Sequence, residues 1–319
     1  MNNHNIFETK NDKNGKDESE IVVCSDEEDS IKILNINSTS YKIINQNSDI
    51  KSRICFNFNK DYIICNKNGI FQINDLFSTI TSSNKIDILN KSYWNGIKIN
   101  SKIIALTSNK NEENGEDKII FFNYYSKRIV ASIENYSFTL SQNNLDMIPR
   151  EESDKSNKIL LCACKKYKDE QKNGILLIML HLKKNVEVLS KKFYESKNFE
   201  VYCFCPISKF YNIKDIKFIE KKNNKMIETE YFLVGGFNSD SNKGAIRLYK
   251  INYNKQEFKN TEIEYIKDIE INSNVGENKF DEFKGKITCI IQSRYNGNIL
   301  VTCSDGNVFL FTFPNIDFY

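Results

Sequence analysis

The chain has 319 residues, 40% of them hydrophobic and 12% aromatic, so it can bury a large core. Its 45 lysine and arginine residues are nearly balanced by 42 aspartate and glutamate residues, which leaves a net charge of +3 at pH 7. So small a net charge gives no strong field for nucleic acid or an anionic membrane, and we expect neither as a partner.

The sequence also bears on the compartment of the protein. It contains no apolar stretch as long as a transmembrane helix, and residues 1–5 lack the apolar segment of a signal peptide. The nine cysteines fit a reducing compartment, where thiols stay free. We therefore expect an intracellular protein, cytoplasmic or nuclear.

The first 19 residues differ in composition from the rest. They are polar and charged with one apolar pair, Ile6 and Phe7, and we predict a disordered arm over residues 1–19. From Glu20 onward, runs of β-forming residues follow one another and helical periodicity is scarce. The sequence therefore predicts one all-β domain over residues 20–319.

One short pattern recurs through this domain: an apolar run, a small or sulfur-containing residue, a polar break and a second apolar run. Its clearest copy has Asp305 and Gly306 in the break, which is typical of a β-hairpin turn. The six pairs of runs are 21–25 with 31–34, 62–66 with 70–73, 103–107 with 118–122, 159–164 with 174–178, 231–236 with 244–249, and 300–303 with 308–311.

A hairpin repeated at intervals of tens of residues indicates a β-propeller, whose blades are four-stranded antiparallel sheets. The hairpins are then the second and third strands of six blades. Outer strands are predicted at 41–44, 127–133, 186–193 and 263–269, and inner strands at 53–58, 92–99, 138–145, 213–219 and 287–292. The run 201–207 has no place in this scheme and allows a seventh blade.

The last predicted blade has no assigned outer strand after its third strand, 308–311. Propellers commonly close with a strand from the N-terminal region, and the sequence offers only Ile6 and Phe7 for this purpose. A sheet edge that stays open invites pairing by another chain.

The segment 298–311 resembles a WD40 repeat, in which the second and third strands meet around an Asp-Gly turn. The resemblance covers residues 20–314 as a layout, and the motif recurs in part at 244–250. Phe311 and Thr312 stand where the family has Trp-Asp, and the Gly-His dipeptide of the family is absent from the sequence. The chain therefore resembles a degenerate WD40-like protein. This resemblance implies a rigid platform that binds other macromolecules without chemistry of its own.

Loops at the rim of a propeller are free to carry contacts. Several connections between the predicted second and third strands are long and charged, and we predict partner contacts there, with solvated insertions as the alternative. The candidate residues are Asp26, Glu27, Glu28, Asp29, Glu112, Glu113, Lys165, Lys166, Lys168 and Asp240.

Residues with metal-binding or catalytic chemistry are few. Cys162 with Cys164 and Cys203 with Cys205 could supply four thiolates, but structural zinc sites usually place their cysteines in turns at a different spacing. We interpret these cysteines as core residues. Two histidines, one of them His181 at the end of an apolar run, are too few for a typical catalytic unit.

Gly235 and Gly236 are followed by neither a predicted helix nor a Lys-Ser/Thr pair, so a phosphate-binding loop is not indicated. A close approach of backbone within a strand explains them better. We expect no enzymatic activity, no catalytic or metal site and no cofactor.

The leading hypothesis is a non-enzymatic intracellular scaffold that binds proteins through the propeller rims, as a monomeric subunit of a hetero-complex. One alternative is a phosphoinositide-binding propeller at membranes, a class that resembles this one but carries an adjacent arginine pair, which this sequence lacks. Another is an open propeller completed in trans by a partner blade, as in coat or nuclear-pore-like complexes.

Overall fold

The computed structural model describes nineteen segments of the chain, and every structural statement below concerns them. They are residues 3–8, 20–25, 31–35, 41–44, 54–58, 61–66, 69–73, 85–86, 93–108, 118–134, 136–138, 144–148, 157–166, 169–182, 186–207, 227–254, 261–269, 283–292 and 298–311. Their regular elements are all β-strands, which confirms the predicted all-β class. None of their elements is a helix long and apolar enough to cross a membrane.

The chain divides into two compact units, 1–142 and 143–319. The first unit has three four-stranded antiparallel sheets and one further short strand, β13 (Tyr136–Phe138). The sheets contain β1 (Asn3–Glu8), β2 (Glu20–Ser25), β3 (Ile31–Asn35) and β4 (Tyr41–Ile44); β5 (Ile54–Phe58), β6 (Asp61–Asn66), β7 (Gly69–Ile73) and β8 (Lys85–Ile86); and β9 (Tyr93–Lys98), β10 (Ile103–Ser108), β11 (Lys118–Asn123) and β12 (Arg128–Ile133).

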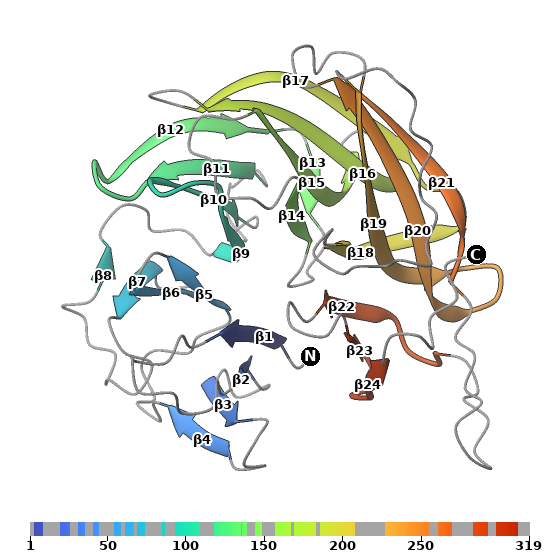
Figure 1. The fold of residues 1–319 in the computed structure, drawn as a ribbon, viewed down its shortest axis with the longest axis horizontal. Helices are drawn as coiled ribbons and strands as arrows, with labels where there is room; N and C mark the ends of the chain where they lie inside the picture. Colours follow the sequence, from blue (N-terminus) through green and yellow to red (C-terminus); the bar gives the residue numbers. More distant parts are fainter. Residues whose placement is uncertain are drawn as a thin grey trace. The chain divides into compact units, whose positions relative to one another are not determined.

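In the second unit, too, each strand pairs with the next along the chain within its own sheet (Figure 1). Its first sheet includes β14 (Leu145–Ile148), β15 (Asn157–Lys166), β16 (Asp169–Leu182) and β17 (Val186–Glu195). The second contains β18 (Phe199–Pro206), β19 (Ile227–Asn238), β20 (Lys243–Asn254) and β21 (Glu262–Asp268), and the third β22 (Ile287–Gln292), β23 (Ile299–Cys303) and β24 (Val308–Phe311).

Strands that are consecutive in sequence are neighbours in five of these sheets and over β14 to β17 of the remaining one, which is the topology of propeller blades. The layout is that of a degenerate WD40-like β-propeller. Of the six sheets that the described residues form, four have four strands, one has five and the last has three. The expectation of six or seven blades with four strands each was therefore wrong, because only four sheets have that composition.

Three segments differ from the sequence-based expectation. The predicted inner strand 138–145 overlaps only the end of β13 and the beginning of β14. Residues 3–8, expected in a disordered arm, form β1, in which Ile6 and Phe7 pair with Val22 and Ile21 of β2. Backbone hydrogen bonding requires little of the side chains, so a polar segment can fill the free edge of β2. The inner strand of the fifth sheet is β18, formed by the run that had no assigned place, whereas the predicted strand 213–219 lies outside the described residues.

The core of the second unit has two parts because the sheet β18–β21 is buried on both faces. Phe232 and Val234 of β19 pack with residues of β15 and β16 in one cluster, and Leu233 between them belongs to the other, with residues of β22 and β23. This division follows from the alternation of side chains across a strand. The Phe232 ring stacks on Tyr249 with 5.6 Å between centroids, and burying such a ring contributes about 1.5–3 kcal/mol.

Gly235 and Gly236 lie where β19 approaches its neighbours most closely. A Cβ atom at Gly235 would lie 2.5 Å from Cγ2 of Ile287 and 2.6 Å from Sγ of Cys203. A Cβ atom at Gly236 would lie 2.1 Å from the carbonyl oxygen of Glu200. The interpretation of this pair as a close approach of backbone is confirmed, and the approach fixes β18 and β22 against β19.

Candidate functional site

One side of the second unit consists of turns and short segments that hydrogen-bond to one another. We call residues 196–198, 239–242, 283–286 and 304–307 the turn edge. The Ser239 amide donates to the carbonyl of Asn198 (3.0 Å), and the amide of Gly244, just after the second turn, donates to the carbonyl of Phe283 (2.9 Å). The Ser304 amide donates to the carbonyl of Lys286 (2.8 Å). The four segments are thus linked in series.

The local sequence accounts for the shape of these turns. Asn198 and Asn242 have φ near 55°, a left-handed conformation that asparagine tolerates better than most residues, and Gly306 has φ 85°. The Asn238 side chain accepts a hydrogen bond from the Asp240 amide (3.0 Å), as in an Asx turn. Side chains of this kind hold the turn edge in a defined conformation.

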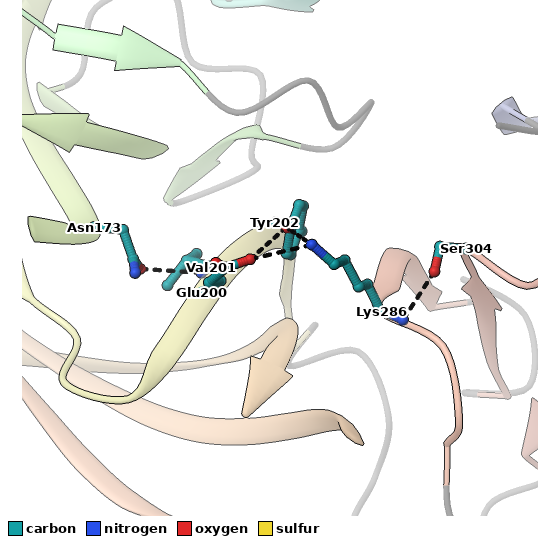
Figure 2. Close-up of polar contacts among 6 residues, drawn as sticks. All are labelled: Asn173, Glu200, Val201, Tyr202, Lys286 and Ser304. Atoms are coloured by element: carbon teal, nitrogen blue, oxygen red, sulfur yellow. Dashed lines mark hydrogen bonds and ion pairs between the residues drawn. The ribbon is translucent and has the colours of Figure 1, made fainter. Parts of the chain in front are cut away.

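A polar cluster of three side chains includes Lys286 of the turn edge (Figure 2). Glu200 and Tyr202 stand two residues apart on β18, so both side chains are on one face of the strand, and Lys286 immediately precedes β22. The Tyr202 hydroxyl donates to Oε2 of Glu200 (2.6 Å) and accepts from Nζ of Lys286 (2.8 Å). Nζ of Lys286 lies 3.3 Å from the same Glu200 oxygen. The cluster therefore connects two neighbouring sheets.

The environment of the polar cluster shifts two pKa values upward. Burial is the main cause of the raised pKa of Tyr202, and its hydrogen bond to Glu200 adds to the effect. The pKa of Lys286 is raised chiefly by its hydrogen bond to Tyr202, against an opposing effect of burial. Nζ of Lys286 also lies 5.4 Å from the centre of the Phe237 ring, within the range of a cation–π contact. At neutral pH the cluster contains a neutral phenol beside an ammonium group, an arrangement suited to hydrogen bonding.

The exposed charges of the turn edge are of both signs. Lys197 and Lys284 are exposed, as are Asp240 and Asp305. This balance suits contacts with mixed polar groups better than the capture of one strong anion.

The turn edge includes one of the ten residues predicted to contact a partner. Asp240 is exposed, and its Oδ2 accepts a hydrogen bond from Nδ2 of Asn198 (2.8 Å). Lys165 and Lys166 end β15, where the structure describes their backbone alone. The other seven lie outside the described residues: Asp26, Glu27, Glu28, Asp29, Glu112, Glu113 and Lys168.

Sequence reasoning missed the polar cluster. Tyr202 and Lys286 are 84 residues apart, so no local motif joins them. The available signal was the pair of polar residues Glu200 and Tyr202 within the apolar run of an inner strand.

The cysteines of the second unit are core residues, as the sequence analysis expected. All six are buried and free, and burial raises the pKa of the Cys162 and Cys203 thiols well above the usual value. Among the residues that the structure describes, no three histidine, cysteine or acidic side chains are placed to hold a metal ion. His181 has a structural contact, between its Nδ1 and Oδ1 of Asn157 on the neighbouring strand.

No family model and no curated protein matches the chain. Solved structures with propeller domains align over most of it. The complex of KlAtg21 with the coiled coil of AgAtg16 aligns with 10% identity over 93% of this chain and 78% of that chain, with a TM-score of 0.45. The mitotic checkpoint complex gives 8% identity over 92% and 73%, with a TM-score of 0.48.

The β-propeller domain of the Trilobed protease from Pyrococcus furiosus gives 10% identity over 98% of this chain and 84% of that domain, with a TM-score of 0.42. Because all three TM-scores are below 0.5, these similarities carry no information about function.

Proposed function

We propose that this protein is a non-enzymatic intracellular scaffold that binds other proteins through the turn edge of its second unit, as a subunit of a hetero-complex. The observation that supports the binding role is the series of hydrogen bonds between successive turns, which fixes exposed side chains of both charges in place. A surface that is already ordered loses little conformational entropy when a partner binds.

The polar cluster makes Lys286 a suitable central contact. Its side chain is 40% exposed, and among the described residues its Nζ has two hydrogen-bond acceptors, Tyr202 and Glu200. An ammonium group has three N–H donors, so one remains for a partner or for water. Tyr202 and Glu200 hold the ammonium group of Lys286 in place (Figure 2).

The first experiment is affinity purification of the tagged full-length chain from its own cells, followed by mass spectrometry. The variant Asp240→Lys/Lys284→Glu reverses two exposed charges of the turn edge and keeps the net charge. The matched control, Glu187→Lys/Lys191→Glu, reverses two exposed charges on β17. We expect the control to retain the partners of the wild-type chain and the turn-edge variant to lose them, with both variants folded by circular dichroism. Retention of the same partners by both variants would contradict the proposal.

The phosphoinositide alternative has less support. Arg247, the described arginine of the second unit, has its Nε 2.9 Å from Oδ1 of Asp268, and its guanidinium lies over the Phe199 ring at 4.1 Å. A guanidinium held by partners within the chain is poorly placed to grip a phosphate bidentately.

A further inference from the structure

One end of the sheet β9–β12 in the first unit carries exposed positive charge. Two connections lie at this end: residues 99–102 join β9 to β10, and residues 124–127 join β11 to β12. The amide of Tyr124 donates to the carbonyl of Lys102 (2.9 Å), so the two connections are in contact. We call residues 99–102 and 124–128 the basic end, after its exposed side chains Lys102, Lys127 and Arg128.

The cations of the basic end have no counter-charge in the described part of this sheet. Among residues 93–108 and 118–134, the one acidic residue is Glu134. It follows β12 at the opposite end of the sheet, where its Oε1 lies 4.0 Å from Nζ of Lys118. The three exposed cations form no ion pair with any residue that the structure describes. Such a surface favours a partner of negative charge.

Hydrophobic side chains are exposed beside these cations. Tyr125 is 63% exposed and Ile129 is 42% exposed. In the part of the first unit whose burial the structure describes, these two are the exposed large hydrophobic residues, and they flank Lys127 and Arg128 in sequence. The Tyr125 ring meets that of the buried Tyr124 edge-on, with 5.5 Å between centroids. Tyrosine and arginine are enriched at the centres of protein interfaces, so this combination suits a protein partner.

Asparagine side chains hold the backbone of the basic end. Oδ1 of the buried Asn100 accepts hydrogen bonds from the amides of Lys102 and Ile103, both at 2.8 Å. Oδ1 of Asn123 accepts from the amides of residues 125 and 126, at 3.1 and 3.0 Å. The cations and the tyrosine thus project from an ordered backbone, which reduces the entropy that binding costs.

The same hydrogen bonds argue against a phosphate as the ligand. Phosphate sites in loops are commonly built from backbone N–H groups that converge on the anion. In the basic end, amides of both connections already donate to Asn100, Asn123 and the carbonyl of Lys102. A chain that carries several separate carboxylates can instead meet each cation singly and place an apolar side chain against Tyr125.

We propose that the basic end binds an extended acidic segment of a partner protein. Its carboxylates contact Lys102, Lys127 and Arg128, and an apolar side chain within the segment packs on Tyr125. Because β10 and β12 flank β11, the backbones of Lys102 and Arg128 stand about 10 Å apart across the sheet. An extended chain covers that distance in about three residues, so acidic residues about two to four positions apart match the cations. This surface is a second one, independent of the turn edge.

Fluorescence anisotropy with the full-length chain tests the proposal. The probe is a labelled peptide, Glu-Ser-Glu-Phe-Glu-Ser-Glu, and the comparison peptide has lysine in place of each glutamate. We expect saturable binding of the acidic peptide alone, weakened roughly tenfold in Lys127→Glu/Arg128→Glu. The matched control Lys191→Glu/Lys284→Glu changes the net charge equally at two exposed lysines of the second unit and should bind as the wild-type chain does. No binding, or an equal loss in both variants, would overturn the proposal.

The variant Tyr125→Ala separates the apolar contact from the charges. We expect its affinity to fall roughly fivefold while the salt dependence of binding stays as in the wild-type chain, and Tyr125→Phe to retain the affinity. The charge-reversal variant Lys127→Glu/Arg128→Glu should instead reduce the salt dependence. Circular dichroism checks that each variant is folded. Unchanged affinity in Tyr125→Ala would overturn the assignment of Tyr125 as a contact.

Other occupants of the basic end give different results. The additional probes are a labelled single-stranded oligonucleotide and phosphatidylcholine vesicles that contain a phosphoinositide. We expect both to bind more weakly than the acidic peptide. Tighter binding of either probe that is lost in Lys127→Glu/Arg128→Glu would overturn the proposal in favour of nucleic acid or a membrane. A wild-type dimer that dissociates in this variant would overturn it in favour of a second copy. None of these outcomes bears on the turn edge, which Asp240→Lys/Lys284→Glu tests.

Discussion

The hydroxyl of Tyr202 illustrates how single residues couple the sheets of the second unit. It donates to a carboxylate of its own strand, Glu200, and accepts from Lys286, which belongs to the next sheet. Without this hydroxyl, the half-buried carboxylate of Glu200 and the ammonium group of Lys286 would each lose a hydrogen-bond partner. Hydrogen bonds to charged groups are among the stronger ones in proteins, so a functional surface built on this cluster depends on one oxygen atom.

The raised pKa values of Tyr202 and Lys286 predict a dependence of stability on alkaline pH. Above the ordinary values of 10.0 and 10.5, the unfolded chain releases protons that the folded chain retains. The unfolded state then binds fewer protons, so the free energy of unfolding falls as the pH rises. We expect the urea midpoint to fall between about pH 9 and 11 and to fall less steeply in Tyr202→Phe.

The matched control for this measurement is Phe204→Leu, which changes an aromatic residue of the core cluster and removes no titratable group. Its urea midpoint should fall with rising pH as steeply as that of the wild-type chain. If the urea midpoint of Tyr202→Phe fell with pH as steeply as that of the wild-type chain, the polar cluster would not contribute to the pH dependence of stability. Because the Lys286 side chain is 40% exposed, solvent screening keeps its share of the effect small.

At the level of strands, Gly235 lies at a close approach between three elements, β18, β19 and β22. In Gly235→Ala, the new methyl group would lie within 3 Å of Ile287, Cys203 and Ile290. Because β18, β19 and β22 all meet there, no single side chain can move away, and we expect a loss of about 1–3 kcal/mol in the free energy of unfolding.

Urea titration measures this loss, with Ser239→Ala as the control. Ser239 is exposed on the turn edge, and its hydrogen bond to Asn198 is made by the backbone amide, so its substitution should change stability by less than about 0.5 kcal/mol. Equal midpoints for Gly235→Ala and the wild-type chain would mean that β19 and β22 separate more easily than their contact suggests.

The strands of the hairpins were predictable because both arms and the turn are contiguous in sequence. The last predicted hairpin, 300–303 with 308–311, differs from β23 and β24 by one residue, and the predicted inner strand 287–292 coincides with β22. The inner strand of the fifth sheet was harder, because β18 ends at Pro206 and its partner β19 begins at Ile227. Two apolar runs, 201–207 and 213–219, precede β19, and local sequence patterns do not show which of them pairs with it.

The candidate site was less accessible to prediction than the strands. Asp240 could be predicted because its turn is local in sequence, whereas the contact between Tyr202 and Lys286 depends on how one sheet packs on the next. Packing of this kind follows from glycine positions such as Gly235, whose neighbours in space come from β18 and β22. The glycines can be located in the sequence, but the strands that each one contacts cannot be predicted from it.

At the scale of the whole second unit, stability rests on sheets stacked face to face. The sheet β18–β21 contributes to both core clusters, with Cys203 and Cys205 in one of them and Val201 and Phe204 in the other. Loss of either neighbouring sheet would therefore expose one complete face of this sheet. Such shared burial predicts that the three sheets of the unit unfold together.

The six cysteines of this unit make that expectation measurable, because they occur in all three sheets: Cys162 and Cys164 on β15, Cys203 and Cys205 on β18, Cys289 on β22 and Cys303 on β23. All are buried, and burial together with Asp305 raises the pKa of Cys303 to about 12. The thiolate is the reactive form, so native thiols should react slowly with an alkylating reagent at about pH 8. We expect all six to become reactive over the same range of urea, followed one by one by mass spectrometry.

A cysteine introduced at the exposed position 239, Ser239→Cys, is the control and should react at once without urea. The informative comparison is between β15 and β22, since the sheet that contains β18 lies between their two core clusters. If Cys289 becomes reactive at a lower urea concentration than Cys162, the three-stranded sheet opens independently and the unit is not cooperative. A single transition would mean instead that the three sheets unfold together. The turn edge, which spans the second and third sheets, would then be lost or kept as a whole. A partner bound there would therefore stabilise the entire unit.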